Sequence, residues 1–597
     1  MGLRKLQRKF ATFFLEKLPS PHFYTGRAKT IFLFFILGFF LLISRGLWLH
    51  LFSKSEMLSS IARQQYQSSI KVSPYRGTIY DRRYIPLAIS VKTPSLAINP
   101  KLFDPSNEEE RQLSKILGIK IEKIRNTENR KNYFAWLKRK IDAESFEKIQ
   151  KLDIPGLYSL MEPARFYPQG TYAAHLLGLV GTDDSGLLGL ERVYDKKLRG
   201  DSGESLRLRD AKGNQIFLNA DSALPQTAGY NLVLTIDTVI QEIAEKALEK
   251  AVNDAKAKTG FAIVADPHTG SILAIANQPG FDPNNPSTMK MQNTNNSAIT
   301  ALFEPGSVMK SFVISSAIEQ GLTSENEIHN CEKGRMQIDD HAFIHDDHPK
   351  ELLTTSEVLV HSSNICTFKL AKRLGKKGLW NTLHNFGFGA EQALIEFPGA
   401  SGGQLSKPDS WAPIRFANIS FGQGILVTGL EVVAGYSVFA NGGNLVKPHV
   451  IERIENEEGH ILYTSELIDK KKILSPKTVT VLRRMLERVV NEGGGGLAKT
   501  LLWTTAGKTG TAEKVDPITH RYGPTMRIAN FVGFAPVNDP HILVYIVIDE
   551  PQGNTYYGGR WAAPPFSEIV EKTLKYLNVA PDKTPVNVMR GASSTNF

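Results

Sequence analysis

One unbroken apolar run lies near the start of the chain, from Ile31 to Ile43, and apolar residues recur as far as Phe52. Together they extend over about 22 residues, long enough for a helix to span a bilayer. The residues before the run are basic, and basic flanks of membrane helices stay in the cytoplasm. We predict a cytoplasmic tail over 1–30, one transmembrane helix over 31–52, and a remainder outside the inner membrane.

The alternative to an anchor is a cleaved signal peptide. The basic tail is long for one, and no small-residue cleavage pattern follows the apolar run, so the sequence favours an uncleaved anchor. Arg45 interrupts the run. Its side chain either snorkels to the outer interface or contacts membrane helices of a partner.

The segment after the anchor is charged, and its residues 76–83 predict a turn followed by a short strand. Residues 53–75 are predicted to form a helix, residues 106–152 carry periodic Leu and Ile typical of helices, and a Gly-rich stretch covers 178–203. We interpret residues 53–230 as an elongated, non-catalytic pedestal.

The second half alternates helix-period and strand-period patterns. Thr238 and Gln241 predict a capping box at a helix start. The other predicted elements are a hairpin of Phe261–Asp266 and Ser271–Ala276, strands Phe531–Pro536 and Ile542–Ile548, and a closing helix Ser567–Leu577. This order indicates an α+β domain, an antiparallel sheet flanked by helices, over 231–580, followed by a tail over 581–597.

Composition and charge exclude some functions. The chain is 42% hydrophobic and 22% charged, which is ordinary for a globular protein. Part of the net charge of +11 sits in the first 30 residues, and no basic stripe is interleaved with aromatic residues. The sequence therefore gives no support for binding nucleic acid.

The first chemical motif is Ser307-Val308-Met309-Lys310, preceded by a Pro and a Gly that predict a helix start. A Ser in the first helical turn lies near free N–H groups and the positive end of the dipole. Lys310 lies one turn further on the same face and could activate the hydroxyl. On its own, a Ser and a Lys at this spacing are more simply explained as a helix cap and a solvated Lys than as a catalytic pair.

Two further motifs follow. Ser362-Ser363-Asn364 ends a helical stretch, and there a second hydroxyl could relay a proton and an amide could hold a peptide. Lys508-Thr509-Gly510-Thr511 is predicted to be an edge strand, whose Gly lets a substrate approach the backbone. The three motifs in this order form a specific signal for penicillin-binding proteins and β-lactamases.

The chain resembles the class B penicillin-binding proteins over roughly residues 30–580. Besides the three motifs, the resemblance rests on Arg76-Gly77 with Asp81-Arg82, Gly189-Leu190-Glu191 with Tyr194-Asp195, Leu198-Arg199-Gly200, Phe421-Gly422-Gln423-Gly424, Ala440-Asn441-Gly442-Gly443 and Phe531–Pro536. One departure is Tyr84, which stands where the family pattern usually has a Gly.

The resemblance implies the penicilloyl-serine transferase fold and a D,D-transpeptidase that needs no cofactor and no metal. Ser307 would attack the penultimate D-alanine of a stem peptide, lipid-linked or in nascent glycan, and Lys310 would take its proton. Ser362 with Lys508 would protonate the leaving amine. Roles are also implied in substrate binding, for Asn364, Thr509, Gly510 and Thr511, and the backbone N–H groups of Ser307 and Thr511 would form an oxyanion hole.

The resemblance also implies partners. β-Lactams would trap Ser307, and a SEDS-type glycosyltransferase and other division proteins would bind the transmembrane helix and the pedestal. The compact segment 183–191 favours the septal, cell-division branch. An elongation-type enzyme is the main alternative. A β-lactamase-like hydrolase, a β-lactam-sensing receptor and a non-catalytic division scaffold are less favoured.

Cysteine and histidine leave two further alternatives. Cys331 and Cys366 either pair in an oxidising compartment or stay as two separate thiols. Ligand-type residues gather between the first two motifs, either as a polar loop or as a metal site of no recognised spacing: His329, Cys331, His341, His345, Asp346, Asp347 and His348.

Overall fold

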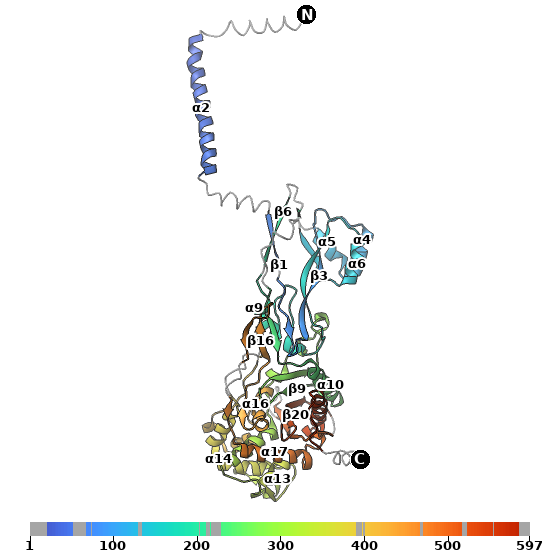
Figure 1. The fold of residues 1–597 in the computed structure, drawn as a ribbon, viewed down its shortest axis with the longest axis vertical. Helices are drawn as coiled ribbons and strands as arrows, with labels where there is room; N and C mark the ends of the chain where they lie inside the picture. The colour runs from blue at the N-terminus through green and yellow to red at the C-terminus, as the bar shows by residue number, and fades with distance from the viewer. Residues whose placement is uncertain are drawn as a thin grey trace. The chain divides into compact units, whose positions relative to one another are not determined.

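The computed structural model describes residues 21–51, 67–72, 74–128, 134–201, 203–209, 215–216, 228–389, 397, 400–465, 470–515, 522–552 and 555–583 (Figure 1). It divides into two units, one of Met1–Val72 with Gly203–Pro225 and the other of Ser73–Ser202 with Gln226–Phe597. The predicted tail over 581–597 lies mostly outside the described residues, and so do residues 1–20 of the predicted cytoplasmic tail. The predicted domain boundaries stay predictions.

The first unit contains the long apolar helix α2 (Pro21–Leu51). Its part Gly26–Trp48 is long and apolar enough to cross a membrane. A small antiparallel sheet pairs β1 (Gln67–Val72) with β6 (Gly203–Arg209), and β6 with β7 (Gln215–Ile216). The helix predicted over 53–75 is therefore wrong where β1 forms, because a strand far away in sequence pairs with it; residues 53–66 lie outside the described part.

The second unit begins with the pedestal. Its sheet has the order β17-β16-β8-β2-β3-β4, and β5 also pairs with β3. The strands are β2 (Ile79–Tyr80), β3 (Pro86–Ile98), β4 (Ala135–Lys138), β5 (Leu157–Phe166), β8 (Asn231–Leu234), β16 (Ile451–Glu455) and β17 (Ile461–Thr464). Thus strands far apart in sequence, such as β2 and β16, build one sheet.

Three helices form a separate small core with the end of β3. They are α4 (Asn107–Leu117), α5 (Ile121–Glu128) and α6 (Ala143–Gln150). Leu113, Leu117 and Ile124 of these helices pack with Leu96 and Ile98 of the sheet. The helical prediction for this region is confirmed, except where β4 interrupts it. Short helices α7 (Ala174–Leu177), α8 (Gly189–Val193) and α9 (Asp195–Leu198) complete the pedestal.

The rest of the second unit corresponds to the α+β domain predicted over 231–580 and is called the catalytic part. It is built on an antiparallel sheet of order β10-β9-β21-β20-β19. Its strands are β9 (Thr259–Ala265), β10 (Ile272–Gln278), β19 (Ala506–Val515), β20 (Tyr522–Ala535) and β21 (Ile542–Asp549). Along β9, Ala262 and Val264 face one core, and Phe261 and Ile263 face the other. This alternation buries both faces of the sheet, and it confirms the predicted hairpin and the two later strands.

Helices cover the two faces (Figure 1). α10 (Thr238–Asp254) and α19 (Ala563–Tyr576) contribute to the core on one face. The helical subdomain on the other face includes α12 (Lys310–Glu319), α13 (Thr355–Val360), α14 (Asn364–Asn385), α15 (Pro413–Ser420), α16 (Gly429–Ala440) and α17 (Pro476–Glu492). The predicted α+β class is confirmed, and this arrangement sets the edge strand β19 beside the helical subdomain.

The start of α10 joins the pedestal to the catalytic part. Asp81 is fully buried, and its carboxylate accepts hydrogen bonds from the Arg83 and Ile85 amides, each 2.8 Å, and from the Thr238 hydroxyl, 2.8 Å. The predicted capping box is therefore wrong. Asp237 is the N-cap, and the Gln241 side chain pairs with the backbone of β10 instead.

A buried ion cluster brings the pedestal signature residues together. The Arg76 guanidinium contacts Glu191 and lies 2.7 Å from Asp195. Arg165 donates to the other oxygen of Glu191 at 2.6 Å. Since these side chains are almost fully buried, apart from that of Asp195, the residues that carried the family resemblance here are structural.

Tyr84 adopts a left-handed backbone with φ 62°. A Gly would adopt this conformation without strain, which explains why the family pattern has one. Here the Tyr84 hydroxyl donates to Glu455 of β16 at 3.1 Å, and the Arg453 guanidinium lies 5.3 Å from the ring centre. These contacts offset part of the backbone strain.

Candidate active site

Ser307 lies in a short 3-10 turn, Gly306–Met309, that runs directly into α12. The predicted helix start is thus confirmed. The Gly306 amide donates to the Gly422 carbonyl at 3.0 Å, and the Gly424 amide donates to Glu304 at 2.7 Å. Two glycines of the Phe421–Gly424 motif therefore anchor the loop that presents the partly exposed Ser307.

Lys310 is completely buried. Its ammonium donates to Ser362 Oγ at 3.1 Å and also to the Ser362 carbonyl. Burial lowers the pKa of Lys310 to about 8, although the nearby charges of Asp346 and Asp347 oppose this shift. A lysine with such a pKa is partly neutral near pH 7 and can accept a proton.

Ser362 links the two lysines. Lys508 Nζ also donates to Ser362 Oγ at 3.1 Å, and to the Thr509 carbonyl at 3.0 Å. Burial, and then the positive charge of Lys310, hold the pKa of Lys508 well below its usual range. Because a hydroxyl oxygen has two acceptor lone pairs and one proton, Ser362 can accept from both lysines and still donate into the cleft.

Asp346 holds the second motif in place, a role that the sequence did not indicate. Its carboxylate accepts from the Ser363 hydroxyl at 2.6 Å and from the amides of Asn364 and Ile365 at 2.5 and 3.0 Å. These bonds satisfy N–H groups at the start of α14. The sequence could not reveal this contact, since Asp346 lies 17 residues before Ser363 in a segment that the sequence leaves as either a polar loop or a metal site.

The two cysteines form a disulfide between Cys331 and Cys366, with Cα atoms 5.2 Å apart. The bond joins the end of β11 (Ile328–Asn330) to the first turn of α14. His329 hydrogen-bonds Thr355 at 2.8 Å. Within the described ranges, no group of three His, Cys, Asp or Glu side chains is arranged to hold a metal ion.

The third motif lies in the edge strand β19, as predicted. A Cβ on Gly510 would lie 2.4 Å from Asn530 Oδ1 and 2.6 Å from the Pro305 carbonyl. Only glycine lets the strand approach the Ser307 loop this closely. In consequence Thr509 and Thr511 face the same cleft as Ser307.

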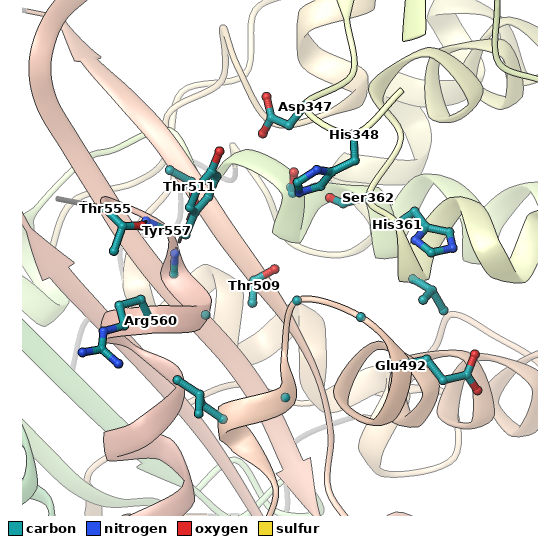
Figure 2. Close-up of a pocket in the computed structure, with 18 residues that line it drawn as sticks. Asp347, His348, His361, Ser362, Glu492, Thr509, Thr511, Thr555, Tyr557 and Arg560 are labelled. Carbon is teal, nitrogen blue, oxygen red and sulfur yellow. Dashed lines mark hydrogen bonds between the residues drawn. The ribbon is translucent and has the colours of Figure 1, made fainter. Parts of the chain in front are cut away.

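The cleft has a volume of about 620 Å³ (Figure 2). It is lined by Ser307, Asp347, His348, Val360, His361, Ser362, Glu492, Gly493, Gly494, Gly496, Leu497, Thr509, Thr511, Thr555, Tyr557, Gly558, Gly559 and Arg560. Lys310 and Lys508 are buried behind this surface. Asn364 is not part of the lining, and its side-chain amide donates to the His345 carbonyl at 2.7 Å.

Sequence reasoning missed several residues of this surface. The glycines after α17 and the segment Thr555–Arg560 form walls of the cleft. Gly558 donates its amide to the Thr511 hydroxyl at 3.3 Å, which ties this segment to β19. A run of four glycines, 493–496, was the only signal in the sequence, and it predicts a turn rather than a site.

Comparisons with known proteins agree with this geometry. The model of the penicillin-binding protein transpeptidase domain matches residues 260–571, and that of the penicillin-binding protein dimerisation domain matches 71–234. The probable peptidoglycan D,D-transpeptidase PenA of Neisseria meningitidis serogroup A is 32% identical over 577 residues, covering 95% of this chain and 96% of that protein.

Two further proteins are similar over most of their length. The peptidoglycan D,D-transpeptidase FtsI of Escherichia coli K12 is 32% identical over 92% of this chain and 91% of its own. The crystal structure of penicillin-binding protein 3 from Mycobacterium tuberculosis, complexed with aztreonam, superposes with a TM-score of 0.68 at 26% identity, covering 86% of this chain and 98% of that one.

Proposed function

Since this chain belongs to the class B penicillin-binding proteins, we propose that it is a peptidoglycan D,D-transpeptidase that cross-links stem peptides through an acyl-enzyme on Ser307. The observation that carries the proposal is the buried network in which Lys310 and Lys508 both donate to Ser362. A non-catalytic scaffold would have no use for two lysines whose pKa values are lowered behind a cleft.

In the first step, neutral Lys310 takes the proton of Ser307, and Ser307 Oγ attacks the carbonyl of the penultimate D-alanine. The backbone N–H groups of Ser307 and Thr511 stabilise the negative oxygen that develops. The hydroxyls of Thr509 and Thr511 bind the terminal carboxylate. The position of Gly510 against the Ser307 loop supports this arrangement.

In the second step, the terminal D-alanine leaves as an amine. Ser362 gives it a proton and recovers one from the lysines that donate to its Oγ. To hold the donor peptide, as the resemblance implies, Asn364 at the start of α14 would turn its side chain from the His345 carbonyl into the cleft. An amine of a neighbouring stem then takes the acyl group, and a β-lactam stops the cycle as a stable ester on Ser307.

The apolar helix α2 and the basic residues before it support a proposal for where the reaction takes place. α2 anchors the chain in the cytoplasmic membrane with its N-terminus in the cytoplasm, and the catalytic part acts outside. The compact segment 183–191 supports a role in septal wall synthesis rather than elongation. A SEDS-type glycosyltransferase that supplies glycan strands, together with other division proteins, would bind α2 and the pedestal.

A fluorescent penicillin tests the proposal on the full-length protein in detergent. We expect a stable covalent adduct on the natural chain and none on Ser307→Ala. Ser287→Ala is the matched control, because the Ser287 side chain is exposed and donates to the exposed Asn285, away from the cleft. Rapid loss of the adduct would indicate a β-lactamase, and no adduct on folded protein would indicate a scaffold.

A further inference from the structure

Asp347 and His348 line the cleft but have no part in the mechanism above. Both side chains are exposed. In Figure 2 the His348 ring points into the cleft on the side where Ser362 lies, and Asp347 lies at the edge, facing the wall that carries Tyr557. The pair therefore faces the space where the reacting groups meet.

The backbone holds this dipeptide from both ends. On one side, the buried Asp346 makes three hydrogen bonds to the start of α14. On the other, Pro349 packs on Gly334, where a Cβ would lie 2.7 Å from the Pro349 ring. The Cys331–Cys366 disulfide links the same segments. A loop that needed only to be polar would not require such anchoring.

The two side chains have unused polar groups. In the part of the chain that the structure describes, neither the Asp347 carboxylate nor the His348 ring has a hydrogen bond or an ion pair. The charge of Asp347 nevertheless reaches the catalytic centre. It acts on Lys310, and, after burial, it is the second cause that raises the pKa of Tyr557. A cation entering the cleft would meet this exposed carboxylate.

The second half of a transpeptidation needs groups of this kind. The incoming amine is an ammonium ion near pH 7 and must lose a proton before it can attack. By microscopic reversibility its nitrogen enters where the leaving amine departed, beside Ser362. Imidazole is the side chain best suited to accept a proton near neutral pH.

We propose that Asp347 binds the acceptor's ammonium group and that His348 is the base that removes its proton. The nitrogen then attacks the ester carbonyl, an N–C bond forms, and the C–O bond to Ser307 breaks. The first ammonium proton goes to His348. The second N–H proton passes through Ser362 to Lys310, which returns it to Ser307 Oγ. This inference rests on the proposed transpeptidase function and adds catalytic residues to its acceptor half.

The test measures the two half-reactions, acylation of Ser307 and transfer to the acceptor amine, separately on the full-length protein in detergent. Ser307 is acylated with an N-acyl-D-alanyl thioester, and release of the acyl group to a soluble tetrapeptide with a free side-chain amine is followed by mass spectrometry. We expect His348→Gln to slow transfer to the amine by about 100-fold. Penicillin labelling should change less than about twofold, because that reaction needs no acceptor.

Asp347→Asn should instead raise the amine concentration needed for half-maximal transfer, with little change in the maximal rate. His341→Gln is the matched control, an exposed histidine of the same loop that does not line the cleft. The tetrapeptide with its amine acetylated should release no more acyl group than water does.

Three results would overturn the inference: unchanged transfer in His348→Gln, an equal fall of transfer and penicillin labelling, or natural enzyme that the free amine discharges no faster than water. Failure of the proposed function is distinguishable, because the natural chain would then form no adduct with penicillin or would lose the adduct rapidly.

Discussion

Ser362 shows how much chemistry one side chain organises at the residue scale. It has a left-handed backbone with φ 57°, and its Oγ lies 3.1 Å from both lysine nitrogens. A non-glycine residue in this conformation needs surroundings that enforce it. Here α13, the start of α14 and the two lysines do so, which places a strained residue at the centre of the site.

The lowered pKa of Lys310 predicts a pH dependence. The neutral form is the base, so acylation by penicillin should rise with pH through about 8. With that pKa the neutral fraction is about 9% at pH 7 and about 91% at pH 9, so the rate should rise roughly tenfold. Stopped-flow labelling from pH 6 to 9.5 measures it. A flat or falling profile, with folding intact, would contradict Lys310 as the base.

Asp346 should affect both the rate and this profile. Asp346→Asn weakens the cap of α14 and removes an opposite charge that favours protonated Lys310. We expect acylation to slow about tenfold, equal to about 1.4 kcal/mol, and the midpoint to move to lower pH. Asp340→Asn, exposed in the same loop, is the control. If the pH midpoint of acylation stays the same or rises, the charge of Asp346 does not favour protonated Lys310.

The three motifs could be located from sequence because each motif is contiguous, and the roles of their residues stay predictions. The role of Asp346 could not be predicted, since its hydrogen-bond partners lie in a different segment, at the start of α14. Thr238 shows the same limit from the other side. A Thr with Gln three residues on is a good capping signal, yet Asp237 caps α10 and Thr238 donates to Asp81 of the pedestal. Tertiary partners decided both cases.

At the scale of elements, local pattern predicted the catalytic sheet well. β9, β10 and β21 carry continuous apolar runs because both faces of the sheet are buried. The edge strand β19 could be recognised by its polar motif. β1 could not be predicted, since its six residues pair with a strand more than a hundred residues later.

The disulfide predicts an effect on α14. Cys331→Ala with Cys366→Ala opens a link across 35 residues, which should lower the free energy of unfolding by about 3–4 kcal/mol. Penicillin labelling should slow because Asn364 lies two residues from Cys366. Calorimetry and labelling measure these effects. Alkylation of the unfolded, unreduced natural chain is the control, and uptake of two labels would show that the bond had not formed.

At the scale of the whole molecule, the pedestal residues that carried the family resemblance form a structural joint. They connect the pedestal to the catalytic part and take no part in the reaction. Asp81 satisfies two pedestal amides and the first residue of α10. The Arg76–Glu191 cluster lies in the same part of the pedestal, where residues far apart in sequence must converge. This explains why a motif search can find these residues while their function is mechanical.

Asp81→Asn tests the joint. An amide presents N–H₂ where one oxygen now accepts, so at least one buried donor loses its partner, at a cost of about 2–3 kcal/mol. We expect a lower thermal unfolding midpoint and a penicillin-labelling rate, measured below that midpoint, within about threefold of natural, because Asp81 does not line the cleft. Asp104→Asn, exposed in the pedestal, should change neither. If Asp81→Asn leaves the thermal unfolding midpoint unchanged, Asp81 does not stabilise the connection between the pedestal and α10.

The oxidation state of Cys331 and Cys366 also indicates whether the catalytic part has crossed the membrane. Disulfides form in oxidising compartments and are rare in the cytosol. A chain held back on the cytoplasmic side would keep two thiols, whereas an exported one would carry none. A non-reducing gel of whole cells treated with a thiol-capping reagent would therefore report, without any fusion or tag, on which side of the membrane the catalytic part has folded.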